Sequence, residues 1–362
     1  MASITANELT LPMRSGHWPR LLLGERVGRY RLTAVLGAGA MGVVYRAFDP
    51  VLGRDVALKS LHVQDVHARQ RFVQEARAMA RVSHPHVVQV FDVVRTARPG
   101  GEGPQWLIAM ELVEGQTLER WLVGAPRSWQ EIRDAFVAAG EGLAAAHAAG
   151  LVHRDFKPAN VIVGRDGRVR VTDFGLSVSA EERAATLDEG GSSASMSIVG
   201  VRGLTSLAGV AVGTPAYMAP EQHRGAALGP AADQFGFCAA LFEALFDVRP
   251  FDGRSCRELS AQKHEGEIRV PRGARAVPAW LRRVVLRGLR AEPERRYASM
   301  LALLAALAGP NRQRRTWRAL RAAVVLSLLG GGLGVAVTGG ADQSAAWSSL
   351  GSAGTPSAGA TG

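Results

Sequence analysis

The sequence has few of the residues that build metal sites or disulfide frameworks. It contains only two cysteines, Cys238 and Cys256, and neither belongs to a CxxC or Cys/His cluster. This excludes a zinc ribbon and a disulfide scaffold, and it is consistent with a reducing compartment. The 362 residues are 47% hydrophobic and 21% charged, which is typical of a globular chain. The length allows one large two-lobed domain with appendages, or two ordinary domains.

Lysine is also scarce. The chain has 43 basic side chains, and only Lys59, Lys157 and Lys263 are lysines. Because arginine supplies nearly every other positive charge, each lysine is expected to be required by its chemistry. An ammonium is a compact point charge, whereas a guanidinium is a planar fork.

Acidic residues are absent from one basic stretch near the C-terminus. The formal net charge is +11, and residues 309–321 concentrate part of it in five arginines: Arg312, Arg314, Arg315, Arg318 and Arg321. The remaining charge is spread without a run. This indicates solvated surface charge and argues against nucleic acid as a partner.

Long hydrophobic runs are missing at the N-terminus and present once at the C-terminus. Residues 1–29 read as an irregular extension, without the apolar core of a signal peptide. Residues 322–341 carry no charge, and a helix of that length at about 1.5 Å per residue spans the roughly 30 Å hydrocarbon core. With the arginines before it, the positive-inside rule predicts a single-pass membrane anchor with a cytoplasmic domain. Its six glycines weaken the span and leave a buried helix or a linker as alternatives, while residues 342–362 form a short Ser/Gly/Ala-rich tail.

The order of predicted elements places strands before helices. Short β-prone runs occur mostly in the first third of the chain, at 30–36, 42–48, 55–61, 87–94 and 106–112. Helical patterns occur at 68–82, 129–149, 231–246, 280–289 and 300–308. Residues 177–212 are rich in Ser, Gly and Ala and predict a long loop. We therefore expect a small β-rich lobe followed by a larger helical lobe.

A glycine-rich loop joins the first two predicted strands. It reads Leu36-Gly37-Ala38-Gly39-Ala40-Met41-Gly42. Glycines in such a loop let backbone amides approach phosphate oxygens, because no Cβ is in the way. The strand–loop–strand context argues against a dinucleotide-binding loop, which leads into a helix. A plain hairpin turn is the alternative.

Two further motifs complete a candidate phosphoryl-transfer site. Lys59 lies on a predicted strand, and Glu75 on the following helix is available to form a buried ion pair that orients it toward phosphates. The string from His153 to Asn160 reads HRDFKPAN, and Asp173-Phe174-Gly175 follows thirteen residues later. Asp155 would orient a substrate hydroxyl and accept its proton, with Lys157 near the transferring phosphate. Asn160 and Asp173 would bind Mg²⁺, which prefers oxygen ligands.

With these motifs the sequence resembles the eukaryotic-type protein kinase superfamily, in its bacterial serine/threonine branch. The resemblance covers about Tyr30 to Leu307 and implies an α+β, two-lobed fold with an antiparallel β-rich N-lobe and a mainly helical C-lobe. It implies a kinase domain at 30–308 whose parts are an N-lobe 30–110, a hinge 111–115, a C-lobe 116–308 and an activation segment 173–221. ATP and Mg²⁺, with Mn²⁺ as an alternative ion, are the implied cofactors.

The resemblance also implies roles for individual residues. Besides the glycine-rich loop and Lys59, it implies contacts to ATP from Val44, Ala57, Met110, Glu111, Val113 and Val163. Met110 falls at the gatekeeper position, and the backbone of Glu111 and Val113 would bind adenine. Asp233 would brace the catalytic loop, and Glu221 of Ala219-Pro220-Glu221 would pair with Arg296.

Substrate class and regulation follow from the same resemblance. Lys157 and Gly213-Thr214-Pro215 are similar to the serine/threonine pattern, which implies transfer of the ATP γ-phosphate to Ser or Thr of protein substrates. Arg154 would belong to a basic pocket for a phosphate on the activation segment. Thr205 and Ser206 are the expected autophosphorylation sites, with Thr214 grouped among the regulatory positions, and a homodimer would allow transfer in trans. Phe156 replaces the commoner leucine, and the segment from Asp173 to Glu221 is unusually long.

Three alternatives remain open at this stage. The Ser-rich segment could be a passive insert. A pseudokinase or membrane-tethered scaffold would bind ATP without transfer, although such proteins usually lack the lysine or one of the two aspartates. A small-molecule phosphotransferase would not be expected to have Gly213-Thr214-Pro215 together with Ala219-Pro220-Glu221.

Overall fold

The computed structural model of the chain divides into two compact units, Met1–Gly309 and Pro310–Gly362. All the residues that the structure describes belong to the first unit: 21–39, 42–61, 66–96, 105–174, 214–224, 228–266, 268, 270–271 and 277–309. No helix within these ranges has the length and hydropathy needed to cross a membrane. The predicted span at 322–341 lies outside them.

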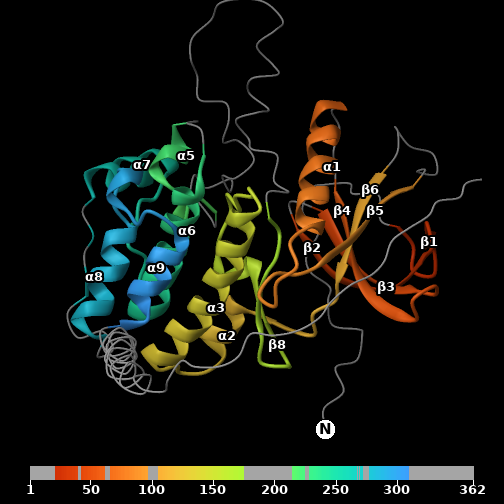
Figure 1. The fold of residues 1–362 in the computed structure, drawn as a ribbon, viewed down its shortest axis with the longest axis horizontal. Helices are drawn as coiled ribbons and strands as arrows, with labels where there is room; N and C mark the ends of the chain where they lie inside the picture. The colour runs from red at the N-terminus through yellow and green to blue at the C-terminus, as the bar shows by residue number, and fades with distance from the viewer. Residues whose placement is uncertain are drawn as a thin grey trace, which may run out of the picture. The chain divides into compact units, whose positions relative to one another are not determined.

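An antiparallel sheet and one helix form the N-terminal lobe (Figure 1). The strands pair in the order β1-β2-β3-β4-β6-β5, and every pairing is antiparallel. The elements are β1 (Arg26–Val27), β2 (Tyr30–Gly39), β3 (Gly42–Asp49), β4 (Arg54–Leu61), α1 (Val66–Ala80), β5 (Val90–Thr96) and β6 (Gln105–Glu111).

The buried core of this sheet shows which residue range belongs to the N-terminal lobe. Burial alternates along much of β3, so that Tyr45 and Ala47 are fully buried on the face that packs against Leu32, Leu58 and Leu107. Residues 21–29, predicted to be an irregular extension, belong to the same core: Val27 is fully buried in β1, which pairs with β2. The folded lobe therefore starts earlier than the expected boundary at Tyr30.

The C-terminal lobe is mainly helical (Figure 1). Its helices are α2 (Leu118–Gly124), α3 (Trp129–Ala148), α5 (Pro220–His223), α6 (Pro230–Phe246), α7 (Cys256–Glu265), α8 (Ala279–Gly288) and α9 (Met300–Leu307). A small sheet of β7 (Gly115–Thr117), β8 (Val161–Gly164) and β9 (Val169–Val171) lies beside them. Helix α6 is buried along nearly its whole length and contacts α3, α8 and α9, so it forms the centre of the lobe.

A second backbone connection joins the lobes, besides the chain that leaves β6. The amide of Val88 donates to the carbonyl of Val171, and the amide of Val171 donates to the carbonyl of His86, both at 2.9 Å. Because Val87 and Val88 pair with β9, the predicted strand at 87–94 begins only at Val90 as β5. The expected α+β, two-lobed fold is confirmed.

Candidate active site

A buried carboxylate holds the segment that carries the candidate catalytic residues. Asp233, in α6, accepts hydrogen bonds from the backbone amides of His153 at 2.7 Å and Arg154 at 2.8 Å. Its Oδ2 also lies 2.7 Å from Nε2 of His147 in α3. Arg154 has a positive φ of 65°, a conformation that is uncommon for residues other than glycine. Asp233 thus stabilises a backbone turn that the local sequence alone does not favour.

The imidazole of His153 links this segment to the residues around Asp173. His153 is fully buried, and its Nε2 lies 2.9 Å from the carbonyl oxygen of Thr172, while its Nδ1 accepts from the amide of Asp155. Its ring lies 4.7 Å from that of Phe174, which is buried. Asp173 between them has a φ of 64°. Two residues with a left-handed backbone, Arg154 and Asp173, therefore lie next to segments that contact His153.

Two predicted catalytic side chains and one predicted metal ligand form one cluster. Nζ of Lys157 donates to Oδ2 of Asp155 at 2.7 Å. Nδ2 of Asn160 donates to the backbone carbonyl of Asp155 at 2.8 Å and to its Oδ2 at 3.2 Å. With an ammonium and an amide beside it, the Asp155 carboxylate is held in one position, as required of a group that orients a substrate hydroxyl.

The ion pairs of Lys59 and Glu75 differ from the expected one. Nζ of Lys59, which is buried, lies 2.7 Å from Oδ1 of Asp173. Oε1 of Glu75 in α1 lies 3.3 Å from a terminal guanidinium nitrogen of Arg154. Two acids and two cations that lie near one another can pair in two ways, and the structure shows Lys59 with Asp173 instead of Glu75.

The donors near Asp155 fit a hard cation such as Mg²⁺. The amide nitrogen of Asn160 is used in bonds to Asp155, so its amide oxygen is the atom that could bind an ion. The Asp173 carboxylate, 24% exposed, is the second oxygen donor. The described residues contain no group of three or more acidic, His or Cys side chains that could hold a metal alone. This suits Mg²⁺, which usually keeps waters and substrate phosphates among its ligands.

The hairpin of the glycine-rich loop requires glycine at one position. Gly39 and Gly42 are partners across β2 and β3, and Gly42 has a φ of 138°. A Cβ at Gly42 would collide with the carbonyl oxygen of Ser60 in β4. The amide of Val43 donates to Oγ of the same serine at 3.1 Å. Gly37 lies in β2, whereas Ala40 and Met41 lie outside the described residues.

The residues expected around adenine gather in one apolar cluster. Its buried members include Ala57 and Met110, and Val44, Val113 and Val163 pack against it. The backbone amide of Glu111 already donates to the carbonyl of Gln89 at 2.8 Å. The expected backbone contact of Glu111 with adenine would therefore have to use its carbonyl oxygen.

An ion-pair network anchors the end of β6, and the sequence did not reveal it. Oε1 of Glu111 lies 3.1 Å from Nε of Arg170 in β9, and Arg170 also donates to both oxygens of Asp166. The hydrogen bonds from Arg170 and Arg168 hold the pKa of Asp166 well below its usual range. Glu111 is thus tied to the β8–β9 hairpin. The one signal in the sequence was that Arg170 is the single charged residue in the two otherwise apolar strands β8 and β9.

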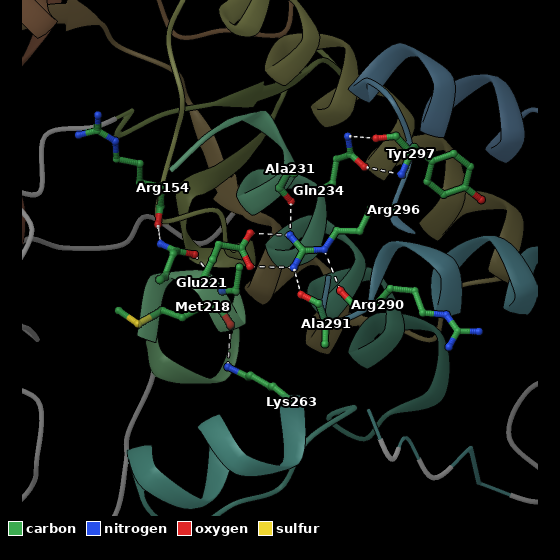
Figure 2. A network of polar contacts seen from close by, with 12 residues as sticks. Arg154, Met218, Glu221, Ala231, Gln234, Lys263, Arg290, Ala291, Arg296 and Tyr297 are labelled. Carbon is green, nitrogen blue, oxygen red and sulfur yellow. Dashed lines mark hydrogen bonds and ion pairs between the residues drawn. The ribbon is translucent and has the colours of Figure 1, made fainter. Parts of the chain in front are cut away.

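The end of the predicted activation segment is anchored by a fully bonded arginine (Figure 2). Arg296 is 1% exposed, and its Nη1 and Nη2 donate to the two oxygens of Glu221 at 2.6 and 2.8 Å. Its other donors reach three backbone carbonyls, those of Arg290, Ala231 and Ala291. All five guanidinium hydrogens therefore have acceptors. The structure brings Glu221 and Arg296 together as the sequence suggested.

The residue after Glu221 connects this anchor to the catalytic segment. Nε2 of Gln222 donates to the carbonyl of Arg154 at 2.7 Å, and its Oε1 accepts from the amide of Ala219 at 2.9 Å. Sequence reasoning did not single out Gln222. Thr214 begins a short 3₁₀ turn, Thr214–Ala216, while Thr205 and Ser206 lie outside the described residues.

Comparison with known proteins places most of the chain in one family. Residues 30–312 match the family model described as "Protein kinase domain". The chain is 34% identical over 297 residues to serine/threonine-protein kinase Pkn1 of Myxococcus xanthus, covering 79% of this chain and 39% of that protein. It is 35% identical over 248 residues to PknA of Mycobacterium tuberculosis, covering 67% of this chain and 52% of that protein. The chain therefore spans about half, or less, of the length of these relatives.

Solved structures give the same result. The crystal structure of the Mycobacterium tuberculosis PknI kinase domain is similar, with a TM-score of 0.59 and 27% sequence identity. The match covers 80% of this chain and 99% of that one.

Proposed function

Because the chain belongs to the protein kinase domain family, we propose that it is a serine/threonine protein kinase, which transfers the γ-phosphate of ATP to Ser or Thr hydroxyls of proteins. One observation carries the proposal. Asp155 is held between Lys157 and Asn160, and the amide of Thr172, which precedes Asp173, donates to the carbonyl of Asn160 at 2.9 Å.

The residues divide the work of phosphoryl transfer among them. Bound Mg-ATP supplies the phosphoryl group and the positive charge that neutralises it. Asp155 orients the acceptor hydroxyl and receives its proton. Lys157 neutralises charge beside Asp155, and Asn160 and Asp173 would hold the ion through their oxygens.

Protein acceptors with Ser or Thr are supported by the anchored segment before α6. A small acceptor would not require such a platform, whereas a protein chain needs a surface that fixes its backbone. Glu221 and Gln222 attach this segment to Arg296 and to the carbonyl of Arg154. This segment is thus anchored to the backbone next to Asp155.

Regulation by autophosphorylation at Thr205 or Ser206 is part of the proposal. Arg154 already binds Glu75, and its Nε is buried without a hydrogen-bond partner among the described residues. A phosphate with a charge of about −1.5 to −2 would compete with Glu75 for this guanidinium. Glu75 would then be released toward Lys59. A phosphosite map of kinase incubated with Mg-ATP, with no occupancy between residues 177 and 214, would contradict this part.

We also propose a membrane anchor at residues 322–341, with a cytoplasmic kinase domain and a homodimer as the form that autophosphorylates in trans. The uncharged stretch and the arginines before it support the anchor. Fractionation of cells that express the full chain, with and without residues 322–362, tests it. Equal distribution of the two forms between membrane and soluble fractions would refute the anchor.

Phosphate transfer by the full chain tests the function. We expect transfer from Mg-ATP to the protein itself or to a generic protein acceptor, abolished by Asp155→Asn and by Lys59→Met. Asp134→Asn is the matched control, because Asp134 is an exposed acid in α3. ATP binding without transfer, also with Mn²⁺ and several acceptors, would refute the kinase proposal and favour a scaffold.

A further inference from the structure

The third lysine of the chain lies outside the set of residues assigned to phosphoryl transfer. Lys263 is in α7 and is fully buried. Its Nζ donates to the backbone carbonyls of Pro215 at 2.6 Å and Met218 at 2.7 Å. It also lies 3.2 Å from Nε2 of His223 in α5. An ammonium has three hydrogens and no lone pair, so these three neighbours match its donors in number.

The contacts of Lys263 all fall on one short segment and the helix that follows it. We call residues 214–219 the acceptor platform. Lys263 bonds to Pro215 and Met218, which lie on either side of the centre of the platform. Figure 2 shows the Lys263 side chain reaching Met218 from below in this view, whereas Arg296 approaches Glu221 from the upper right. The platform is therefore held by two cations, with Arg296 binding Glu221 just beyond its end.

The acceptor platform adjoins the candidate catalytic segment. Met218 and Asp155 line the same small cavity. A Cβ at Gly236 of α6 would lie 3.2 Å from the carbonyl oxygen of Phe156 and 3.3 Å from that of Tyr217, so both backbones pass closely over one glycine. A displacement of the platform would therefore change the surface beside Asp155 on which an acceptor must lie.

The surroundings of Lys263 disfavour its positive charge, so we infer that its hydrogen bonds to the platform are the reason for a lysine there. No carboxylate of the described residues forms an ion pair with Lys263. Burial lowers the pKa of Lys263 to about 7, and burial with the neighbouring cation lowers the pKa of His223 to about 4. The other groups facing Lys263 are the ring of Phe235, 5.8 Å away, and Cys256 of its own helix. An apolar side chain at this position would avoid the free-energy cost of burying a cation. It would also lack the hydrogen bonds that Lys263 makes to the platform.

Arginine would not fit the same contacts. The acceptors of Lys263 surround one nitrogen atom, whereas a guanidinium spreads its hydrogens over a planar fork. Only three of the 43 basic residues of the chain are lysines, and the other two lie beside Asp173 and Asp155.

We propose that Lys263 is a positioning residue for the protein acceptor: its ammonium fixes the backbone of the acceptor platform and so sets the affinity for the acceptor, without affecting ATP. This inference rests on the proposed kinase function. Lys263 acts through Pro215 and Met218 and is not itself catalytic.

The test compares Lys263→Met with Arg257→Met in the full chain. Arg257 is an exposed cation of the same helix and serves as the matched control. For Lys263→Met we expect the KM for the protein acceptor to rise about tenfold to a hundredfold, which corresponds to about one hydrogen bond from a charged donor. This is less than the two lost bonds are worth, because Arg296 still anchors Glu221 just beyond the platform. The KM for ATP should stay within about twofold of wild type, because the hydrogen-bond partners of Lys263 include no residue assigned to the ATP site among those that the structure describes. Arg257→Met should leave both values unchanged.

Hydrogen exchange makes the result independent of catalysis. Amides of the acceptor platform should exchange faster in Lys263→Met than in Arg257→Met, with α3 and α6 unchanged. Faster exchange without any transfer by wild type would overturn the kinase function and retain the anchoring role. Unchanged exchange and an unchanged acceptor KM in an active enzyme would overturn the inference about Lys263 alone.

Lys263→Gln covers the case in which Lys263→Met does not fold. Its amide can donate two hydrogen bonds, so an intermediate acceptor KM supports the proposal. Failure of both variants to fold would overturn it, because Lys263 would then be required for folding and not for positioning the acceptor.

Discussion

The bonding of Arg296 predicts a large loss of stability when the guanidinium is removed. The perturbation is Arg296→Met, which keeps an unbranched apolar stem. Glu221, 7% exposed, would lose both of its ion-pair bonds. Three backbone carbonyls would lose their donors as well. Breaking a buried ion pair by removing one partner costs about 3–5 kcal/mol, and we expect the free energy of unfolding to fall by that amount.

The assay is urea unfolding, followed by circular dichroism, of wild type and three variants. These are Arg296→Met, Glu221→Leu and the double variant. The double variant should lose less than the sum of the single losses, because it leaves no isolated carboxylate. Arg257→Met is the control for loss of one positive charge and should change stability by less than about 0.5 kcal/mol. A loss below about 1 kcal/mol for Arg296→Met, or additive losses in the double variant, would refute the reasoning.

Three further predictions concern other parts of the site. Gly42→Ala should raise the KM for ATP and reduce stability by about 1–3 kcal/mol, because its Cβ would strike Ser60; a thermal-shift and ATP-titration series checks this, and wild-type values would contradict it. The pKa of Lys263 is lowered to about 7, so its charge is unfavourable in the folded state. Wild type should therefore gain about 2 kcal/mol of stability relative to Lys263→Met as the pH rises from about 7 to about 9. A difference in the free energy of unfolding that stays constant over this range, measured by urea unfolding, would argue against a buried cation. Asp233→Asn should lower kcat at least about tenfold with little change in the KM for ATP, because an amide cannot accept all the bonds from two backbone amides and His147; steady-state kinetics with unchanged kcat would exclude a bracing role.

The sequence predicted the elements whose apolar pattern is regular. Helix α3 was expected at 129–149 and is observed at Trp129–Ala148, because Ile132, Phe136 and Leu143 repeat at helical spacing and are all buried. The capping box of Ser128 and Glu131 marks its start. In such segments local preference and core packing agree, so boundaries differ by one or two residues.

Helix α7 was missed because only one side of it is buried. Leu259 and Lys263 are its buried residues, and a lysine does not count as apolar when periodicity is read. The signals that could have found α7 were at its ends. Ser255 caps it by accepting from the amide of Glu258, and Gly266 ends it with a φ of 68°. The residue that we assign to acceptor positioning was thus noticed for its scarcity and not for its location.

The site was predictable in its members and not in all of its pairs. Asp155, Lys157 and Asn160 lie within six consecutive residues, so the local turn brings them together. Lys59 and Glu75 belong to different elements, β4 and α1, and their partners depend on how α1 sits against Arg154 and Asp173. Residue spacing carries no information about such a choice between two ion pairs.

The backbone bonds between His86–Val88 and β9 have a mechanical consequence. The lobes are joined through the chain that leaves β6 and again through these bonds, which link Val88 and Val171. Two lobes that are connected at two separate points can rotate about the line through both points, and their other relative motions are restricted. Rotation of one lobe relative to the other is therefore expected to occur mainly about a single axis.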